Sequence, residues 1–117
     1  MKNLFICYPK CSTCKKAKDF LDEKHITYDF RNITTDIPTS EELKNWVDMS
    51  GLPVKKFFNK SGLMYKQLHL KDKIFLMSET ELLNILATNG MLIKRPIFVT
   101  NSQVFVGFDQ DEWSLIK

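Results

Sequence analysis

Two cysteines separated by two residues, Cys11 and Cys14, are the side chains best suited to chemistry in this sequence. They follow an apolar stretch and stand at the expected start of a helix, within Tyr-Pro-Lys-Cys-Ser-Thr-Cys-Lys-Lys. In a reducing compartment a Cys-x-x-Cys pair is more often catalytic, redox-sensing or metal-binding than structural. The spacing therefore predicts a redox-active dithiol.

The position of Cys11 favours the thiolate, which is the reactive form of a thiol. Unpaired backbone N–H groups and the dipole at a helix N-terminus stabilise an anion. Lys10, Lys15 and Lys16 are close in sequence, and the thiol of Cys14 could donate a hydrogen bond to Cys11. We expect a lowered pKa at Cys11, which makes it the nucleophile. Cys14 would then resolve the intermediate by forming a Cys11–Cys14 disulfide.

Two other interpretations of the pair stay open. A zinc site would need two further ligands, and the candidates Cys7, His25 and His69 lack zinc-finger spacing. The pair could also be buried and inert, although flanking lysines at a strand–helix junction are an unusual setting for that. Cys7 lies inside the apolar stretch, where cysteine commonly packs as a small hydrophobic residue. We therefore predict no metal site.

The hydrophobic pattern predicts the elements that position the cysteines. An apolar run over residues 3–8 indicates a buried strand, and an apolar face at helical spacing indicates a helix over 12–24. Alternation over 27–32 predicts a second strand. In such a β-α-β unit the cysteines lie at the carboxyl end of a central strand, where open α/β sheets place their sites.

The middle of the chain is expected to be helical. Capping boxes predict one helix from Thr39 to Gly51 and another from Ser78 to near Gly90. Shorter helical pieces are expected around residues 54–58 and 65–68.

Strands return near the end of the chain. Apolar and β-branched residues predict a hairpin of strands over 96–100 and 103–107, and Asp109 is expected to cap a short last helix. The element order predicts an α/β fold with helices packed on a small mixed sheet.

Composition excludes several classes of protein. The 117 residues fit a single domain, 1–117. With 44% hydrophobic residues the chain can form a core without disulfides or metal ions to stabilise it. A net charge of +3 is too small to indicate direct nucleic-acid binding. There is no apolar run of about 20 residues for a membrane span, and the N-terminal apolar stretch is too short for a signal peptide. We expect a cytoplasmic monomer that makes no membrane contact.

Three segments carry a resemblance to a known family. Residues 8–18 around the cysteines, Gly-Met-Leu-Ile-Lys-Arg-Pro-Ile at 90–97 and Val-Gly-Phe-Asp-Gln-Asp-Glu at 106–112 resemble the arsenate reductase (ArsC)/Spx family. Residues 59–68 are similar to the central segment of that family. The resemblance implies a thioredoxin-like fold with a four-stranded mixed sheet and a helical insertion at about residues 38–92. It also implies that Pro96 is cis and faces the cysteine loop.

The arsenate reductase branch implies a thiol enzyme. Its glutaredoxin-linked members use one cysteine, matching Cys11, and three arginines that bind the oxyanion. Arg95 matches one of these arginines, but Asn59 and Phe108 occupy the other two positions. Lysine does not replace a bidentate arginine without loss, so we expect weak arsenate binding. Those enzymes also usually have serine where this chain has Cys14.

The Spx branch implies a different function, a redox switch that binds RNA polymerase. Its Cys-x-x-Cys forms a disulfide, and Cys11, Cys14 and Arg95 fit its pattern. A glycine that helps Spx proteins to contact the polymerase corresponds roughly to Gly51, which is also explained as the residue that ends a helix.

The sequence thus predicts a thiol–disulfide redox protein related to arsenate reductases. Cys11 is the nucleophile, Cys14 resolves, and Arg95 stabilises the thiolate or a bound anion. The supporting residues are Lys10, Ser12, Thr13 and Pro96.

No bound cofactor is expected in this protein. Glutathione with glutaredoxin, or thioredoxin, would be the external reductant, and a small thiol or a redox protein would be the partner. The alternative is an Spx-like regulator that binds the C-terminal domain of the RNA polymerase α-subunit. Other side chains are expected to be structural: Arg31, His25 and His69 on the surface, and Trp46 and Trp113 in the core.

Overall fold

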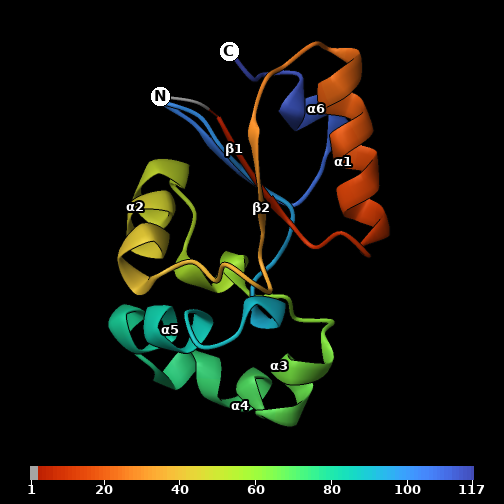
Figure 1. The fold of residues 1–117 in the computed structure, drawn as a ribbon. Helices are drawn as coiled ribbons and strands as arrows, with labels where there is room; N and C mark the ends of the chain where they lie inside the picture. Colours follow the sequence, from red (N-terminus) through yellow and green to blue (C-terminus); the bar gives the residue numbers. More distant parts are fainter. Residues whose placement is uncertain (1–2) are drawn as a thin grey trace.

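A four-stranded mixed sheet lies at the centre of the computed structural model, which describes residues 3–117 (Figure 1). The strands are β1 (Leu4–Cys7), β2 (Asp29–Asn32), β3 (Ile97–Val99) and β4 (Val104–Val106), in the order β2-β1-β3-β4. The β1–β2 pair is parallel and the other two pairs are antiparallel. The apolar strand that precedes the cysteines is therefore central, as predicted.

Alternating side chains of β1 face two different layers of helices. Phe5 and Cys7 face α1 (Ser12–Glu23) and α6 (Gln110–Trp113), whereas Ile6 belongs to the core on the opposite face. Figure 1 shows α1 and α6 on one side of the sheet and α2 (Ser40–Ser50) on the other. The predicted inner face of α1 is buried: Cys14, Ala17, Phe20 and Leu21.

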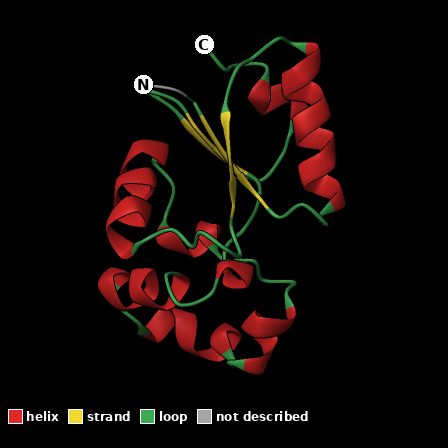
Figure 2. Ribbon diagram, viewed as in Figure 1, coloured by secondary structure: helices red, strands yellow, loops and turns green. Residues whose placement is uncertain are grey.

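A helical insertion separates β2 from β3 (Figure 2). After α2 it contains η1 (Val54–Phe57), α3 (Leu63–Gln67), α4 (Leu70–Lys73), η2 (Ile74–Leu76), α5 (Glu79–Leu86) and η3 (Gly90–Leu92). Both predicted capping boxes are present, at Thr39 and Ser78, and Gly51 ends α2 with φ 71°. The sequence did not predict α4 and η2, because such short elements leave no readable periodicity.

The entry to the insertion is fastened by Arg31, which was expected to be a surface charge. Its side chain is only 13% exposed. Two guanidinium nitrogens donate hydrogen bonds to Glu42 at 2.6 and 2.9 Å, and the guanidinium lies 5.9 Å from the ring centre of Trp46. Arg31 therefore joins β2 to α2. The surface prediction was wrong because its partner lies 11 residues away, on another element.

The exit from the insertion is fastened by backbone contacts. The N–H of Lys94 donates to the carbonyl of Phe57 at 2.7 Å, and Phe58 forms an isolated antiparallel bridge with Ile93. The N–H of Asn59 donates to the carbonyl of Leu92 at 2.8 Å. These contacts set the insertion beside the segment that carries Arg95 and leads into β3.

Several further predictions are confirmed. The α/β architecture, the four-stranded mixed sheet and the insertion are present. The Arg95–Pro96 bond is cis. Trp46 and Trp113 are buried, and His25 and His69 are exposed. Within residues 3–117, the helices are all too short or too polar to cross a membrane.

Candidate active site

A groove of about 1130 Å³ opens where the first turn of α1 meets the insertion. Cys11 and Thr13 contribute one wall, and Arg95 contributes another. The β4–α6 turn adds Gly107 and Phe108. The insertion and the segment after it supply an asparagine and a group of cations: Asn59, Lys55, Lys56, Lys60 and Lys94. Asp109 and Glu112 also line the groove, so a thiol lies in a groove where five basic side chains outnumber two acidic ones.

Cys11 holds the N-cap position of α1, as predicted. Its backbone is extended, with φ −87° and ψ 125°, and its N–H donates to the carbonyl of Tyr8 at 3.0 Å. The side chain is partly exposed and its thiol is free. This geometry lets the sulfur face the groove while the helix begins behind it.

The electrostatics of the groove favour the thiolate of Cys11. Partial burial raises the pKa of the thiol, but the backbone N–H groups of Cys14 and Thr13 lower it. The charge of Arg95 and its hydrogen bond to the sulfur lower it further, so the net pKa lies below its ordinary value. The predicted effect of the backbone N–H groups at the helix N-terminus is therefore present, whereas the three flanking lysines that were also expected to contribute are exposed: Lys10, Lys15 and Lys16.

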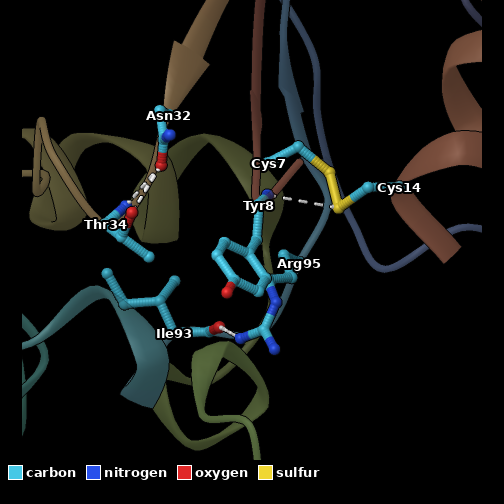
Figure 3. The surroundings of a disulfide bond; sticks show 7 residues. All are labelled: Cys7, Tyr8, Cys14, Asn32, Thr34, Ile93 and Arg95. Carbon is cyan, nitrogen blue, oxygen red and sulfur yellow. Dashed lines mark hydrogen bonds between the residues drawn. A yellow bond between two sulfur atoms is a disulfide. The ribbon is translucent and has the colours of Figure 1, made fainter. Parts of the chain in front are cut away.

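Arg95 is held in place by Tyr8 and Ile93 (Figure 3). Its guanidinium lies 5.5 Å from the ring centre of Tyr8, and its Nη1 donates a long, 3.5 Å hydrogen bond to the carbonyl of Ile93. Its Nε is buried without a hydrogen-bond partner among the described residues. The guanidinium is therefore positioned by packing and keeps donors for an anion in the groove.

The disulfide in the structure joins Cys14 to Cys7, and not to Cys11 as the sequence predicted. The Cα atoms of Cys7 and Cys14 are 5.9 Å apart, within the usual range for a disulfide. The reason is orientation: Cys14 lies on the inner face of α1 against the end of β1, whereas Cys11 faces the groove. Cys7 was expected to be a small apolar residue. It is fully buried, but it is also covalently bonded.

The N–H of Tyr8 completes this arrangement. It donates to the sulfur of Cys14 at 3.4 Å (Figure 3). Tyr8 is thus a site residue that the sequence did not identify: its backbone contacts one sulfur, and its ring supports the arginine beside another. The signal for Cys7 was available, because Cys7 ends a buried strand and Cys14 lies on the buried helix face.

The remaining predicted site residues lie in three kinds of place. Thr13 lines the groove with Cys11 and Arg95. Lys10 and Ser12 are exposed side chains outside the lining of the groove. Pro96 is buried and precedes β3, and its carbonyl accepts the N–H of Gly107 at 2.8 Å. The structure therefore brings three of the predicted residues together and leaves Lys10 and Ser12 to the surface.

The two positions that correspond to oxyanion-binding arginines both line the groove. Asn59 donates from its side chain to the carbonyl of Met91 at 3.5 Å. The ring of Phe108 packs edge-on against Trp113, with centroids 5.0 Å apart. An amide and an aromatic ring therefore stand at the two positions where the family resemblance implied guanidinium groups. Lys55 and Lys56 also line the groove and were not identified from the sequence, because only the tertiary fold brings them into one groove with Cys11.

A zinc site would need further ligands beside the two cysteines. Across residues 3–117, His, Cys, Asp and Glu side chains do not gather in groups of three or more that could hold a metal ion.

Comparison with known proteins gives consistent matches along the whole chain. The model of the ArsC family matches residues 7–116. The uncharacterized protein YusI of Bacillus subtilis is 47% identical over 113 residues, which cover 97% of this chain and 96% of YusI. The global transcriptional regulator Spx of Staphylococcus aureus is 31% identical over 105 residues, or 89% of this chain and 78% of Spx.

A solved structure extends the comparison to the fold. The crystal structure of a Bacteroides fragilis protein described as ArsC family related has a TM-score of 0.97 and 56% sequence identity, covering 100% of this chain and 98% of that one. This likeness confirms the predicted thioredoxin-like architecture with its insertion.

Proposed function

Since this chain belongs to the ArsC family, we propose that it is a thiol–disulfide oxidoreductase with Cys11 as its nucleophile. One observation carries the proposal: a free thiol with a lowered pKa lies beside Arg95 in a cationic groove. The helix N-terminus and the guanidinium favour the thiolate before the substrate arrives.

The reaction begins when the thiolate of Cys11 attacks one sulfur of a disulfide substrate. The substrate S–S bond breaks, one half leaves as a thiolate, and the other half remains bonded to Cys11. A second thiol then attacks Cys11 and releases that half. In the fully reduced protein Cys14 supplies this thiol. Glutathione with glutaredoxin, or thioredoxin, would restore the reduced protein.

The groove favours an anionic substrate of modest size. Lys55, Lys56, Lys60 and Lys94 line the same groove as Cys11, and a disulfide that contains glutathione carries carboxylates that could pair with them. Arsenate is a less suitable substrate, because Asn59 and Phe108 leave Arg95 as the one guanidinium lining the groove in the described structure. We propose that arsenate reduction is slow or absent.

The test compares oxidised glutathione and arsenate as substrates for the reduced protein. We expect consumption of the disulfide that is lost in Cys11→Ser, and arsenate turnover much slower than in a three-arginine enzyme assayed in parallel. Lys71→Ser, outside the groove, is the matched control and should keep wild-type rates. Disulfide consumption that persists in Cys11→Ser would refute the proposal. Efficient arsenate turnover would overturn the proposed preference.

A second candidate function is transcriptional regulation through a protein partner. It is supported by the similarity to Spx reported above and by an exposed apolar patch at the end of α2. Met49 is 40% exposed and Leu52 is 39% exposed, on either side of Gly51.

A pull-down with the C-terminal domain of the RNA polymerase α-subunit tests this role. Binding should be lost in Leu52→Glu and kept in Leu63→Glu, whose side chain is 70% exposed on the insertion. Lack of binding by both the oxidised and the reduced wild-type protein would exclude it.

A further inference from the structure

We infer that Cys7 is a third working cysteine, which takes the disulfide over from Cys11 and Cys14 and thereby frees the nucleophile for another reaction. This inference rests on the proposed function, because it begins with the adduct on Cys11. It differs from a two-cysteine mechanism in its end state. The oxidised protein holds a buried Cys7–Cys14 bond and a free Cys11, which is the state in the structure.

Cys14 is close to both other cysteines. Its sulfur is bonded to Cys7 at the end of β1. Its backbone N–H, together with that of Thr13, acts on the sulfur of Cys11, which lies three residues earlier. The sulfur of Cys11 is therefore held at the turn of α1 that carries Cys14.

The exchange balances in two steps after the adduct has formed. First, the thiolate of Cys14 attacks the sulfur of Cys11, so a Cys11–Cys14 bond forms and the substrate half leaves as a thiolate. Second, the thiolate of Cys7 attacks the sulfur of Cys14, so a Cys7–Cys14 bond forms and Cys11 leaves as a thiolate. Two protein thiols have then been oxidised and one substrate disulfide has been reduced.

Electrostatics favour Cys11 as the leaving group in the second step. The amides of Cys14 and Thr13 and the guanidinium of Arg95 stabilise its thiolate, and a thiol with a lower pKa leaves faster. The N–H of Tyr8, which points at the sulfur of Cys14, would stabilise the Cys14 thiolate that is needed in the first step.

Burial sets the order of the three cysteines. Cys7 is 0% exposed and Cys14 is 4% exposed, whereas Cys11 is partly exposed in the groove. A substrate therefore meets Cys11 first. A thiol reductant also enters through Cys11, because attack of the Cys11 thiolate on Cys14 regenerates the Cys11–Cys14 bond, whose outer sulfur can be reached.

Disulfide mapping over time can follow the exchange. Fully reduced protein is mixed with oxidised glutathione, quenched with acid at intervals, unfolded, and blocked with N-ethylmaleimide before digestion. Trypsin cleaves after Lys10, so Cys7 is released in one peptide while Cys11 and Cys14 stay together in another. A Cys11–Cys14 bond leaves one peptide two hydrogens lighter. A Cys7–Cys14 bond links two peptides and leaves the maleimide on Cys11.

In the wild-type protein we expect the Cys11–Cys14 bond to appear first and then to decay as the linked peptides accumulate. Cys7→Ala should stop at the Cys11–Cys14 bond, and Cys7→Ser should do the same, which separates loss of the thiol from a packing defect at this buried position. After the exchange, wild-type Cys11 should accept a further glutathione, whereas Cys7→Ala should not.

Two outcomes would overturn the inference while leaving the proposed function intact. In one, wild-type protein ends with a Cys11–Cys14 bond and a blocked Cys7. In the other, Cys11→Ser forms the Cys7–Cys14 bond as fast as wild type does. If instead glutathione never attaches to Cys11 of the wild-type protein, the proposed function fails first, and the exchange fails with it.

Discussion

The two faces of the sheet are packed with different kinds of side chain. The face under α1 and α6 holds two cysteines among aromatic rings, with Phe5, Phe98 and Trp113 in mutual contact. The face under α2 and the insertion is mainly aliphatic, with residues such as Ile6, Leu43 and Leu86. The sulfur chemistry therefore lies over the aromatic face, and the insertion on the other side contributes most of the lysines of the groove.

Of the changes on the aromatic face, replacement of Cys11 should have the largest effect on thiol reactivity. We expect Cys11→Ser to abolish rapid alkylation by iodoacetamide at pH 6, because the other two cysteines are bonded and buried. Its free energy of unfolding should change by less than about 0.5 kcal/mol, as for other surface changes. Rapid alkylation that survives the substitution would show that another cysteine is the reactive one.

Truncation of a core tryptophan tests whether the aromatic face also holds the groove. Trp113 is 1% exposed and donates from its ring nitrogen to the carbonyl of Gly107 at 3.0 Å. Trp113→Ala should lower the free energy of unfolding in urea by about 3–5 kcal/mol and slow alkylation of Cys11. Trp46→Ala, on the opposite face, should cost a similar amount without slowing alkylation. Equal effects on alkylation would remove the distinction between the faces.

Reduction of the Cys7–Cys14 disulfide should have the next largest effect. The bond joins residues seven positions apart in the sequence, and for such a short loop chain entropy predicts a loss of roughly 2–3 kcal/mol on reduction. Thermal unfolding with and without a thiol reductant measures it. Cys7→Ala, which cannot form the bond, should show no difference.

Removal of the guanidinium should change reactivity more than stability. Arg95 helps to lower the pKa of Cys11, so Arg95→Met should shift the alkylation profile toward higher pH and slow the reaction a few-fold at pH 6. The difference should disappear at high pH, where both proteins are thiolates. Lys94→Met is the matched control, and an identical profile for both variants would show that groove charge in general, and not Arg95, sets the pKa.

The smallest expected effect is that of the Arg31–Glu42 pair, on the side of α2, on the free energy of unfolding. The hydrogen bonds from Arg31 lower the pKa of Glu42, so the pair stabilises the fold fully above the unfolded pKa of about 4.3. That contribution is lost as pH falls through the lower pKa of the folded state. Because the Glu42 side chain is 36% exposed, we expect no more than about 1 kcal/mol. The difference between wild type and Glu42→Gln should shrink from pH 7 to pH 3, and a constant difference would contradict this account.

Local patterns in the sequence predicted most of the fold. The capping boxes that begin at Thr39 and Ser78 each lie within four consecutive residues, so the start of each helix can be recognised locally. The buried face of α1 is predicted by the spacing of its apolar residues alone. The features that were missed depend on distant partners. Arg31 donates hydrogen bonds to Glu42, which lies beyond the turn after β2, and Cys14 is bonded to Cys7 across the β1–α1 junction. The Cys-x-x-Cys spacing of Cys11 and Cys14 predicted a disulfide between them, whereas Cys14 is bonded to Cys7.

Fastening of the insertion at both ends has a consequence for recognition. The Arg31–Glu42 contact and the hydrogen bond from Lys94 to Phe57 tie the insertion to the sheet on entry and on exit. The part of the insertion that carries Lys55, Lys56 and Lys60 is then held in place and does not act as a lid, so its distance from Cys11 is set before a ligand binds. A preorganised wall loses little conformational entropy on binding. Discrimination among disulfides would then depend on the length and the charge spacing of the molecule that enters.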